Sequence, residues 1–376
     1  ARERFHFIYP DNTDGTIASV TDAVGTTSFT YDESGRIASE NGPFDNDTIE
    51  RSYDAFDRLI SFSLKSDNAA PRTAVSYAYD SIDRLKSATS AGTEHKYSFR
   101  GSSYQITQIK RNSKTVVSNN YDLLKRLTLK QNMSASGSIL SSFSLEYNNS
   151  DEIIRKVENT GKTTAYSYDS IGQLVSSNKT DNGGSALAAT SYSYDPMGNR
   201  LAATSSDPSN PSNLSYTSNS LNQYAEIFNT DGTASTPSYD ENGNCTKADL
   251  PTGTWTFAYD DENRPVEQIK DGTKIGFLYD YLGRRRVKTV YSYDMVFGDW
   301  TPQTRTEYIY SGWNLVEKRE GPAQPLSPTP STYYTWGLGT GGVGGLLSVK
   351  TDYGTYFPQY NDNGNIISYT DENDNP

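Results

Sequence analysis

The stretch YDSIDRLKS, from Tyr79 to Ser87, decides the fold of this chain. Before it, Tyr77 and Tyr79 fall on one side of an extended run, because side chains along a strand point alternately to its two faces. Asp80 is suited to accept hydrogen bonds from the amides of a tight turn, and Leu85 starts a second run. This stretch therefore predicts a β-hairpin.

The same pattern returns along most of the chain, and repeats of this period indicate a stacked array. Clear copies begin at Tyr31, Tyr53, Tyr79, Tyr121, Tyr168, Tyr194, Tyr239, Tyr259 and Tyr279. Degenerate copies fall at Tyr9, Phe99, Tyr147, Ser218, Tyr310, Tyr334 and Tyr360. The steps are mostly about 20 to 26 residues, with a longer one after Tyr279, and predict about sixteen units and roughly thirty strands.

A single hairpin is marginally stable in water, but stacking pairs every internal edge into a continuous sheet. We therefore predict an all-β fold, with one domain over residues 1–376. Each unit uses tyrosine to anchor the sheet and Asp, with Gly in many units, to close the turn, since Gly tolerates positive φ. Arginine is expected to lie across neighbouring rings and reach an Asp of the same or the next unit.

The predicted structural residues are Tyr31, Asp32, Gly35, Arg36, Tyr53, Asp54, Arg58, Tyr79, Asp80, Arg84, Tyr121, Asp122, Arg126, Tyr168, Asp169, Gly172, Tyr194, Asp195, Gly198, Tyr239, Asp240, Gly243, Tyr259, Asp260, Tyr279, Asp280 and Gly283. We assign no residue to catalysis, to a cofactor or to a metal.

The composition supports a folded but polar protein. The mean hydropathy is −0.73, while 29 Tyr, 13 Phe and 4 Trp supply large side chains for burial. The net charge of −12 argues against nucleic acid or an anionic membrane as partner and favours a basic one. The single cysteine, Cys245, excludes an internal disulfide, and no apolar run approaches the roughly 20 residues of a membrane span.

Several motifs suggest chemistry, but structural interpretations fit them better. His6 and His95 are isolated from each other, which offers little for a metal site or a catalytic triad. Asp260 and Asp261 occupy a turn, where Asp is expected for capping. The glycine-rich run at 341–345 lacks the Lys-Ser/Thr of a phosphate-binding loop. Cys245 takes the place of an aliphatic residue in its unit and is expected to act as a small hydrophobe.

With nine Tyr-Asp copies in register, the chain resembles the Rhs/YD-repeat family, which includes bacterial Rhs proteins, the C component of Tc toxins and the shell of animal teneurins. The segment YYTWGLGTGGVGGLLSV from Tyr333 looks like the end of bacterial Rhs cores. The resemblance implies a long sheet that spirals into a hollow shell around a toxin or other polypeptide. The chain stops at DENDNP, before the family's C-terminal plug and toxin domain, so an open or partial spiral is expected.

Two functions from different classes follow from these patterns. The leading hypothesis is a non-enzymatic scaffold, secreted or at the cell surface, that encloses a cargo from the same or a companion chain. The alternative is an adhesion or carbohydrate-binding module that uses exposed rings to bind surface glycans. A hydrolase beyond the C-terminal end is the weakest hypothesis. No cofactor, nucleic-acid partner or membrane span is predicted for this chain.

Overall fold

The computed structural model describes residues 6–8, 15–66, 69–209, 211–229, 231–250, 253–323, 331–337 and 345–375. Strands, turns and connecting segments make up these residues, and no helix occurs among them. The described residues accordingly hold no long apolar helix of the kind that crosses a membrane. The predicted fold, an all-β array of stacked hairpins, is confirmed.

The chain divides into two compact units. Unit 1 comprises residues 1–116, 134–137 and 273–376, and unit 2 comprises residues 117–133 and 138–272. The prediction of one domain over residues 1–376 stays a prediction.

The strands of unit 1 are β1 (His6–Ile8), β2 (Ser19–Thr21), β3 (Thr26–Tyr31), β4 (Ile37–Asn41), β5 (Ile49–Tyr53), β6 (Leu59–Ser66), β7 (Ala69–Tyr79), β8 (Leu85–Ser90), β9 (Thr93–Phe99), β10 (Ile106–Arg111), β26 (Thr273–Tyr279), β27 (Arg285–Asp294), β28 (Asp299–Ser311), β29 (Asn314–Pro322), β30 (Ser331–Trp336), β31 (Leu346–Thr351), β32 (Gly354–Tyr360) and β33 (Ile366–Thr370). β11 (Lys114–Tyr121) crosses the boundary between the units.

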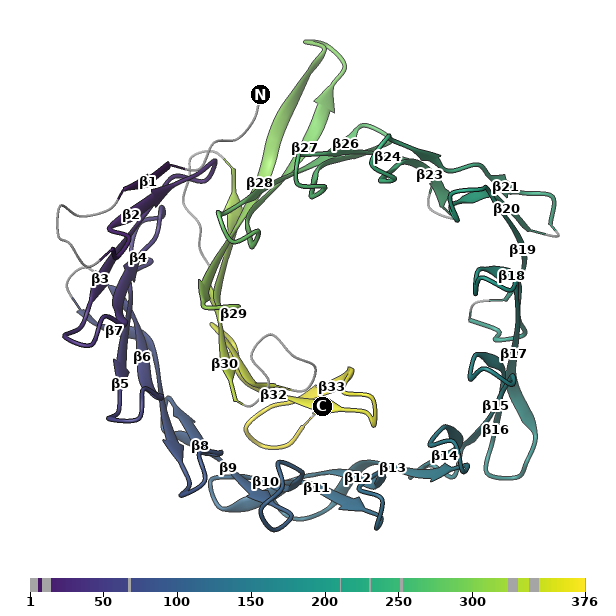
Figure 1. Cartoon of the computed structure of the whole chain (residues 1–376), viewed down its shortest axis with the longest axis horizontal. Coiled ribbons are helices and arrows are strands. Elements are labelled where there is room, and N and C mark those ends of the chain that lie inside the picture. The colour runs from purple at the N-terminus through teal and green to yellow at the C-terminus, as the bar shows by residue number, and fades with distance from the viewer. Residues whose placement is uncertain are drawn as a thin grey trace. The chain divides into compact units, whose positions relative to one another are not determined.

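The strands of unit 2 are β12 (Leu127–Met133), β13 (Ile139–Tyr147), β14 (Ile153–Glu158), β15 (Thr163–Tyr168), β16 (Leu174–Thr180), β17 (Ala186–Tyr194), β18 (Arg200–Ser205), β19 (Ser212–Ser218), β20 (Tyr224–Asn229), β21 (Ala234–Ser235), β22 (Ser238–Tyr239), β23 (Cys245–Leu250), β24 (Gly253–Tyr259) and β25 (Pro265–Lys270). Figure 1 shows strands following one another in chain order in both units.

The hairpins that turn directly after an anchoring tyrosine carry a β-bulge at that residue. In the hairpin of β7 and β8, Ala78 pairs with Ser87 while Tyr79 pairs with Leu85, so the register shifts by one residue. The same shift occurs at Tyr53 between β5 and β6 and at Tyr194 between β17 and β18. A bulge bends the strand and increases its local twist, so the repeat fixes both the turn and the bend that precedes it.

Unit 1 buries a hydrophobic core between its early and late strands. Ile49, Leu64 and Val75, from β5, β6 and β7, form one cluster with Ile309 and Val316, from β28 and β29. Figure 1 shows β29 and β30 running beside β4 to β7. The two groups of strands therefore cover one another's apolar faces, as sheets do in two-layered β proteins.

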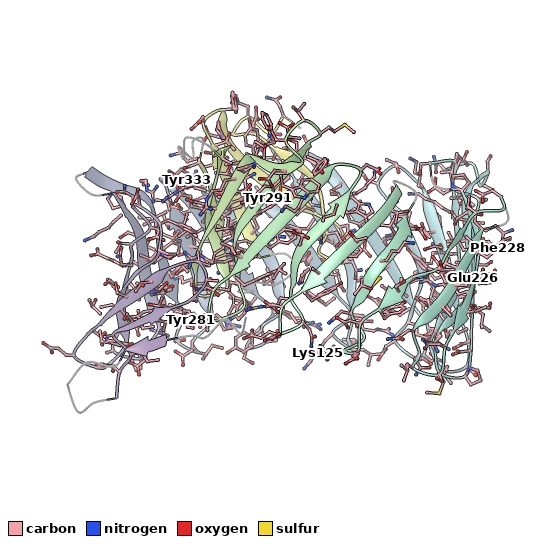
Figure 2. The ribbon with its side chains drawn as sticks, turned by 90° about the horizontal axis from the view of Figure 1, so that it is seen from above. Lys125, Glu226, Phe228, Tyr281, Tyr291 and Tyr333 are labelled. Atoms are coloured by element: carbon pink, nitrogen blue, oxygen red, sulfur yellow. The ribbon has the colours of Figure 1, made fainter. Side chains whose placement is uncertain are left out.

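Unit 2 has no comparable core among its described residues. Along β17 the side chains alternate between exposed and half-buried, and none is buried. On β20, Glu226 and Phe228 are both exposed (Figure 2). The strands of unit 2 belong to two sheets, β12 to β21 to one and β22 to β25 to the other. Within each sheet they are held by strand pairing and by contacts between successive hairpins.

Candidate functional site

In the clear units, the turn is closed by the aspartate that follows the tyrosine. Asp32 accepts hydrogen bonds on Oδ1 from the amides of Ser34 and Arg36, both at 3.0 Å. Its Oδ2 accepts from Arg36 Nε at 2.7 Å. The amide of Gly35 donates to the carbonyl of Asp32, and Gly35 adopts a φ of 76°. One carboxylate thus satisfies the turn amides and fixes the arginine that starts the return strand.

This arrangement recurs in the other predicted turns. Asp54, Asp80, Asp122, Asp260 and Asp280 each hold the arginine four residues later through Oδ2. At Asp169, Asp195 and Asp240 the arginine is replaced by Gln173, Asn199 and Asn244, whose side-chain amides donate to the same oxygen. The sequence-predicted aspartates therefore share one geometry.

The turn hydrogen bonds stabilise the ionised carboxylates. The amide of Arg36 is the largest influence that lowers the pKa of Asp32, and the side-chain amide of Asn199 is the largest that lowers the pKa of Asp195. A carboxylate with a lowered pKa remains ionised and acts as an acceptor. These groups are structural acceptors and are poorly suited to act as general acids near neutral pH.

The anchoring tyrosine ties each unit to the one before it. Its hydroxyl donates to the carbonyl of the residue that follows the arginine position of the preceding unit. For example, Tyr79 donates to Leu59 at 2.9 Å, and Tyr194 donates to Leu174 at 2.9 Å. The same bond is made by Tyr31, Tyr53, Tyr147, Tyr168, Tyr239, Tyr259, Tyr310 and Tyr360. Tyr121 and Tyr279 occupy the same bulge position on β11 and β26.

Several of the arginines tie a unit to the next one. The guanidinium of Arg58 lies 4.7 Å from the ring centroid of Tyr79, and its Nη1 donates to Asp83 in the following turn at 2.6 Å. Arg36 uses Tyr53 and Asp57 in the same way. We name the set of turn bonds, tyrosine bond and arginine contacts the repeat clamp.

Three aspartates of the repeat clamp are not among the residues predicted from sequence. Asp57, Asp83 and Asp151 occupy the turn position where other units carry Gly, and they adopt positive φ angles of 63°, 65° and 63°. Few non-glycine residues adopt this region, and Asp is among those that do so most often. Each accepts a hydrogen bond from the arginine of the preceding unit. In the sequence, these residues can be recognised as an Asp at the Gly position of a turn when the preceding unit carries an Arg.

One of the degenerate units lies at a different residue from the one predicted. The unit expected at Tyr334 is instead centred on Trp336, where the register shift between β30 and β31 falls. The indole N–H of Trp336 donates to the carbonyl of Leu315 at 2.6 Å, in place of a tyrosine hydroxyl. The unit expected at Tyr9 lies outside the described residues.

A second polar assembly, the charge network, lies between the early and late strands of unit 1. Its members are Glu40, Asp47, Arg51, Arg72, Asp280, Arg284, Arg286, Glu307, Glu317 and Arg319. Glu317 is fully buried and pairs with Arg72 at 3.1 Å and Arg319 at 3.0 Å. Arg319 also donates to the carbonyls of Asp45 and Asn46. These bonds join β29 to the turn between β4 and β5.

Asp47 is the member of the charge network with the most perturbed acidity. Its buried carboxylate faces Arg286 at 3.5 Å and accepts from the amide of Phe44 at 3.1 Å. Burial raises the pKa of Asp47 to about 6, despite the opposing influence of that amide and of Arg286 and Arg319. Desolvation outweighs the ion pair, as expected for a charge removed from water.

The residues that could carry catalysis or bind a metal do not assemble. His95 is buried against Phe357, and burial, followed by the charge of Arg111, lowers the pKa of its imidazole to about 4. The thiol of half-buried Cys245 donates to the carbonyl of Lys247. No group of three metal-binding side chains occurs within the described part of the chain. The side chain of His6 and the run at 341–344 lie outside what the structure describes.

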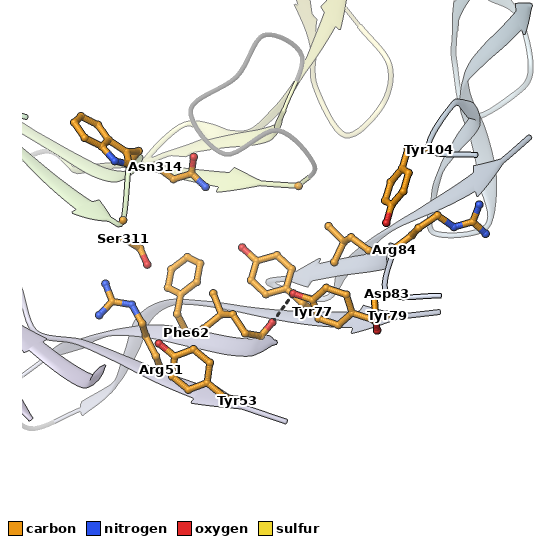
Figure 3. A pocket seen from close by; sticks show the side chains of 15 residues that line it. Arg51, Tyr53, Phe62, Tyr77, Tyr79, Asp83, Arg84, Tyr104, Ser311 and Asn314 are labelled. Carbon is orange, nitrogen blue, oxygen red and sulfur yellow. Dashed lines mark hydrogen bonds between the residues drawn. The ribbon is translucent and has the colours of Figure 1, made fainter. Parts of the chain in front are cut away.

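Unit 1 also contains an aromatic cavity of about 570 Å³ (Figure 3). Phe62, Tyr77 and Tyr79 line its interior, and the exposed rings of Tyr104 and Trp313 stand at its border. Arg51 and Asn314 add polar groups to the lining. The cavity combines ring faces with hydrogen-bonding groups.

These features define a class of protein: an all-β array in which hairpins are clamped to their neighbours through Tyr, Asp and Arg. The family model described as Teneurin YD-shell matches residues 102–296, more than half of the 376 residues. The chain belongs to the Teneurin YD-shell family.

Individual relatives cover different shares of the chain. The tRNA3(Ser)-specific nuclease WapA of Bacillus spizizenii is 28% identical over 207 residues, which is 54% of this chain and 8% of that protein. This chain therefore spans about 8% of the length of that relative.

Two toxin structures are similar to this chain at low identity. The crystal structure of TcdB2-TccC3-TEV has 12% identity and a TM-score of 0.44, covering 95% of this chain and 22% of that one. The Tc holotoxin pore of Photorhabdus luminescens has 12% identity and a TM-score of 0.31, covering 96% of this chain and 26% of that one.

Proposed function

We propose that this chain is a wall segment of a hollow β-shell that encloses a polypeptide, and that it acts as a scaffold without catalysing a reaction. Its membership in the Teneurin YD-shell family supports the scaffold. The observation that carries the proposal is the sheet of unit 2, where alternate side chains of β17 stay exposed and the others are only half-buried. A sheet with two wet faces suits a wall between two aqueous spaces.

The chemistry of the unit 2 sheet fits a wall that does not help its contents to fold. Hydroxyl groups on directly opposed residues bond to each other, as Ser177 does with Thr190 at 2.7 Å and Ser191 with Thr204 at 2.6 Å. Such pairs satisfy their own hydrogen bonds and present little apolar surface. A partly unfolded polypeptide would find few apolar contacts there.

The net charge of the chain favours one kind of polypeptide as the contents of the shell. With a net charge of −12, the chain favours a basic polypeptide, whether it comes from the same chain or a companion chain. A toxin is the cargo that the family resemblance implies. Secretion or display at the cell surface is part of this proposal.

Limited proteolysis of the complete gene product tests the shell. The polypeptide encoded beyond the hairpin array should resist protease while the array is intact, and should be cleaved rapidly when expressed alone. Cleavage at the same rate in both preparations would refute enclosure. Cryo-electron microscopy of the protected sample should then show density inside a closed wall.

The aromatic cavity supports a second candidate, a carbohydrate-binding module. The exposed rings of Tyr104 and Trp313 beside Arg51 and Asn314 resemble surfaces on which sugar rings stack. A glycan array probed with the chain and with a Trp313→Ala, Tyr104→Ala variant tests it. Binding that the variant loses supports recognition in the cavity, and no binding by the parent chain eliminates this candidate.

A further inference from the structure

The hairpin of β27 and β28 extends past the strands beside it. β26 pairs with β27 only as far as Ser292, and β29 pairs with β28 only as far as Thr304. Beyond them, Tyr293 pairs with Trp300 and Asp294 with Asp299. The end of this hairpin therefore projects from the other strands of unit 1 (Figure 1).

Three consecutive apolar residues form the apex of this hairpin. Met295, Val296 and Phe297 are 91%, 86% and 83% exposed. Single exposed apolar side chains are ordinary, but three together on a projecting turn form a contiguous patch, and such patches mark interaction sites. We call residues 293–300 the apolar tip.

Three amides at the apex of the apolar tip are already hydrogen-bonded. Asp294 Oδ1 accepts from the amides of Val296 and Phe297 at 2.8 and 3.2 Å, and the carbonyl of Asp294 accepts from the amide of Gly298 at 2.8 Å. A turn whose amides are already hydrogen-bonded can move from water into lipid without leaving these donors unpaired. This is the condition that a lipid environment imposes on backbone groups.

An aromatic pair lies one position further from the apex than the acidic pair Asp294 and Asp299. The rings of Tyr293 and Trp300 pack edge to face with centroids 5.2 Å apart. The ammonium of Lys274 lies 5.3 Å from the Trp300 ring and 4.6 Å from the Tyr291 ring. Tyrosine and tryptophan concentrate at membrane interfaces, because their rings are apolar and their O–H and N–H groups remain hydrated. From the apex towards the base, the hairpin thus presents apolar side chains, then an acidic pair, then aromatic rings with polar edges.

We propose that the apex of the apolar tip inserts into the interfacial region of a zwitterionic lipid bilayer, with the acidic pair Asp294 and Asp299 and the rings of Tyr293 and Trp300 at the level of the headgroups. The acidic pair Asp294 and Asp299 and the net charge of −12 oppose binding to anionic lipid. Insertion is peripheral, since it involves a turn and not a spanning element. This inference goes beyond the proposed shell and does not depend on any cargo.

Vesicle binding by the whole chain tests the proposal. The chain should co-sediment with phosphatidylcholine vesicles, and a variant with Met295→Ser, Val296→Ser and Phe297→Ser should bind about tenfold or more weakly, because the apolar area that drives insertion is gone. A Leu123→Ser, Leu124→Ser variant is the matched control. These residues are also exposed, at 93% and 68%, but lie in an ordinary repeat turn, so their loss should leave binding unchanged.

The remaining outcomes decide against the proposal. Failure of the parent chain to bind phosphatidylcholine overturns it, as does equal binding by the tip variant, provided that far-ultraviolet circular dichroism shows both proteins folded. Adding phosphatidylserine should weaken binding, and stronger binding would contradict the charge argument. If vesicles are not bound but the tip variant loses self-association in sedimentation velocity, the tip is a protein contact and the lipid proposal fails.

Discussion

Units 1 and 2 use the same repeat but are stabilised in different ways. In both, the repeat clamp joins neighbouring hairpins, as at Tyr79 in unit 1 and Tyr194 in unit 2. Unit 1 adds a buried cluster that includes Leu64 and Ile309, together with the charge network. Among the described residues of unit 2, Phe143, Leu145 and Ala203 are the buried hydrophobic side chains. The repeat clamp and strand pairing therefore suffice to form a sheet. In unit 1, the buried core in addition makes the strands unfold cooperatively.

Removal of a buried charge should produce the largest difference between the two units in the free energy of unfolding. Glu317→Gln keeps the side-chain volume but leaves Arg72 and Arg319 without their shared carboxylate. Breaking a buried ion pair costs about 3–5 kcal/mol, so the free energy of unfolding of unit 1 should fall by this amount. Urea unfolding followed by hydrogen exchange of each unit measures it. The half-exposed pair of Arg155 and Glu146 is the control, where Glu146→Gln should cost about 0.5 kcal/mol.

A core truncation should give the next largest difference. Leu64 is fully buried in the cluster of unit 1, so Leu64→Ala should lower the free energy of unfolding by about 2–5 kcal/mol. Leu174 holds a half-buried place at the start of β16, and Leu174→Ala should cost about 1 kcal/mol. Equal losses in the two variants would show that unit 2 has a core of its own.

Acidification from pH 7 to 5 should act on unit 1 through two buried groups of opposite effect. Burial raises the pKa of Asp47 to about 6 from an ordinary 3.8, so the folded state takes up its proton first and the free energy of unfolding rises by about 1.4 kcal/mol between pH 7 and 5. His95 acts in the other direction, because burial lowers its pKa to about 4 from 6.5, so the unfolded state takes up that proton first. In an Asp47→Asn variant, acidification from pH 7 to 5 should therefore lower the free energy of unfolding by about 1.4 kcal/mol more than it does in the parent chain. The turn aspartates, such as Asp195, have lowered pKa values, so their stabilisation is lost only below about pH 4.

Deleting one hydroxyl of the clamp should have the smallest effect. Tyr194→Phe removes the bond to the carbonyl of Leu174 while keeping the ring, at a cost of about 1 kcal/mol. Hydrogen exchange should quicken in β16 to β18 and stay unchanged in unit 1. Faster exchange throughout both units would mean that they unfold together, which would contradict the comparison.

The parts of the molecule that follow from sequence are those with local causes. The contact of Asp80 with Arg84 spans four residues and depends only on turn chemistry, so the repeat predicts it. The contact of Arg72 with Glu317 spans 245 residues, and nothing in the spacing of either residue indicates its partner. Trp336 was overlooked because its indole N–H replaces a phenol, a substitution that becomes evident only with the strand register. The longer step after Tyr279 contains the apolar tip, whose exposure the spacing of the repeat does not indicate.

The repeat clamp also has a consequence for how such chains change in length. Each tyrosine bond reaches back one hairpin and each arginine contact reaches forward one, as Tyr79 and Arg58 show. The acceptor of the tyrosine bond is a backbone carbonyl, so a hairpin that is duplicated or deleted as a whole leaves this bond with a partner at the new junction, whatever the neighbouring side chains are. Genetic recombination between repeats can therefore lengthen or shorten the array in whole steps, each of two strands or about 9.5 Å across the sheet, without loss of the tyrosine bond.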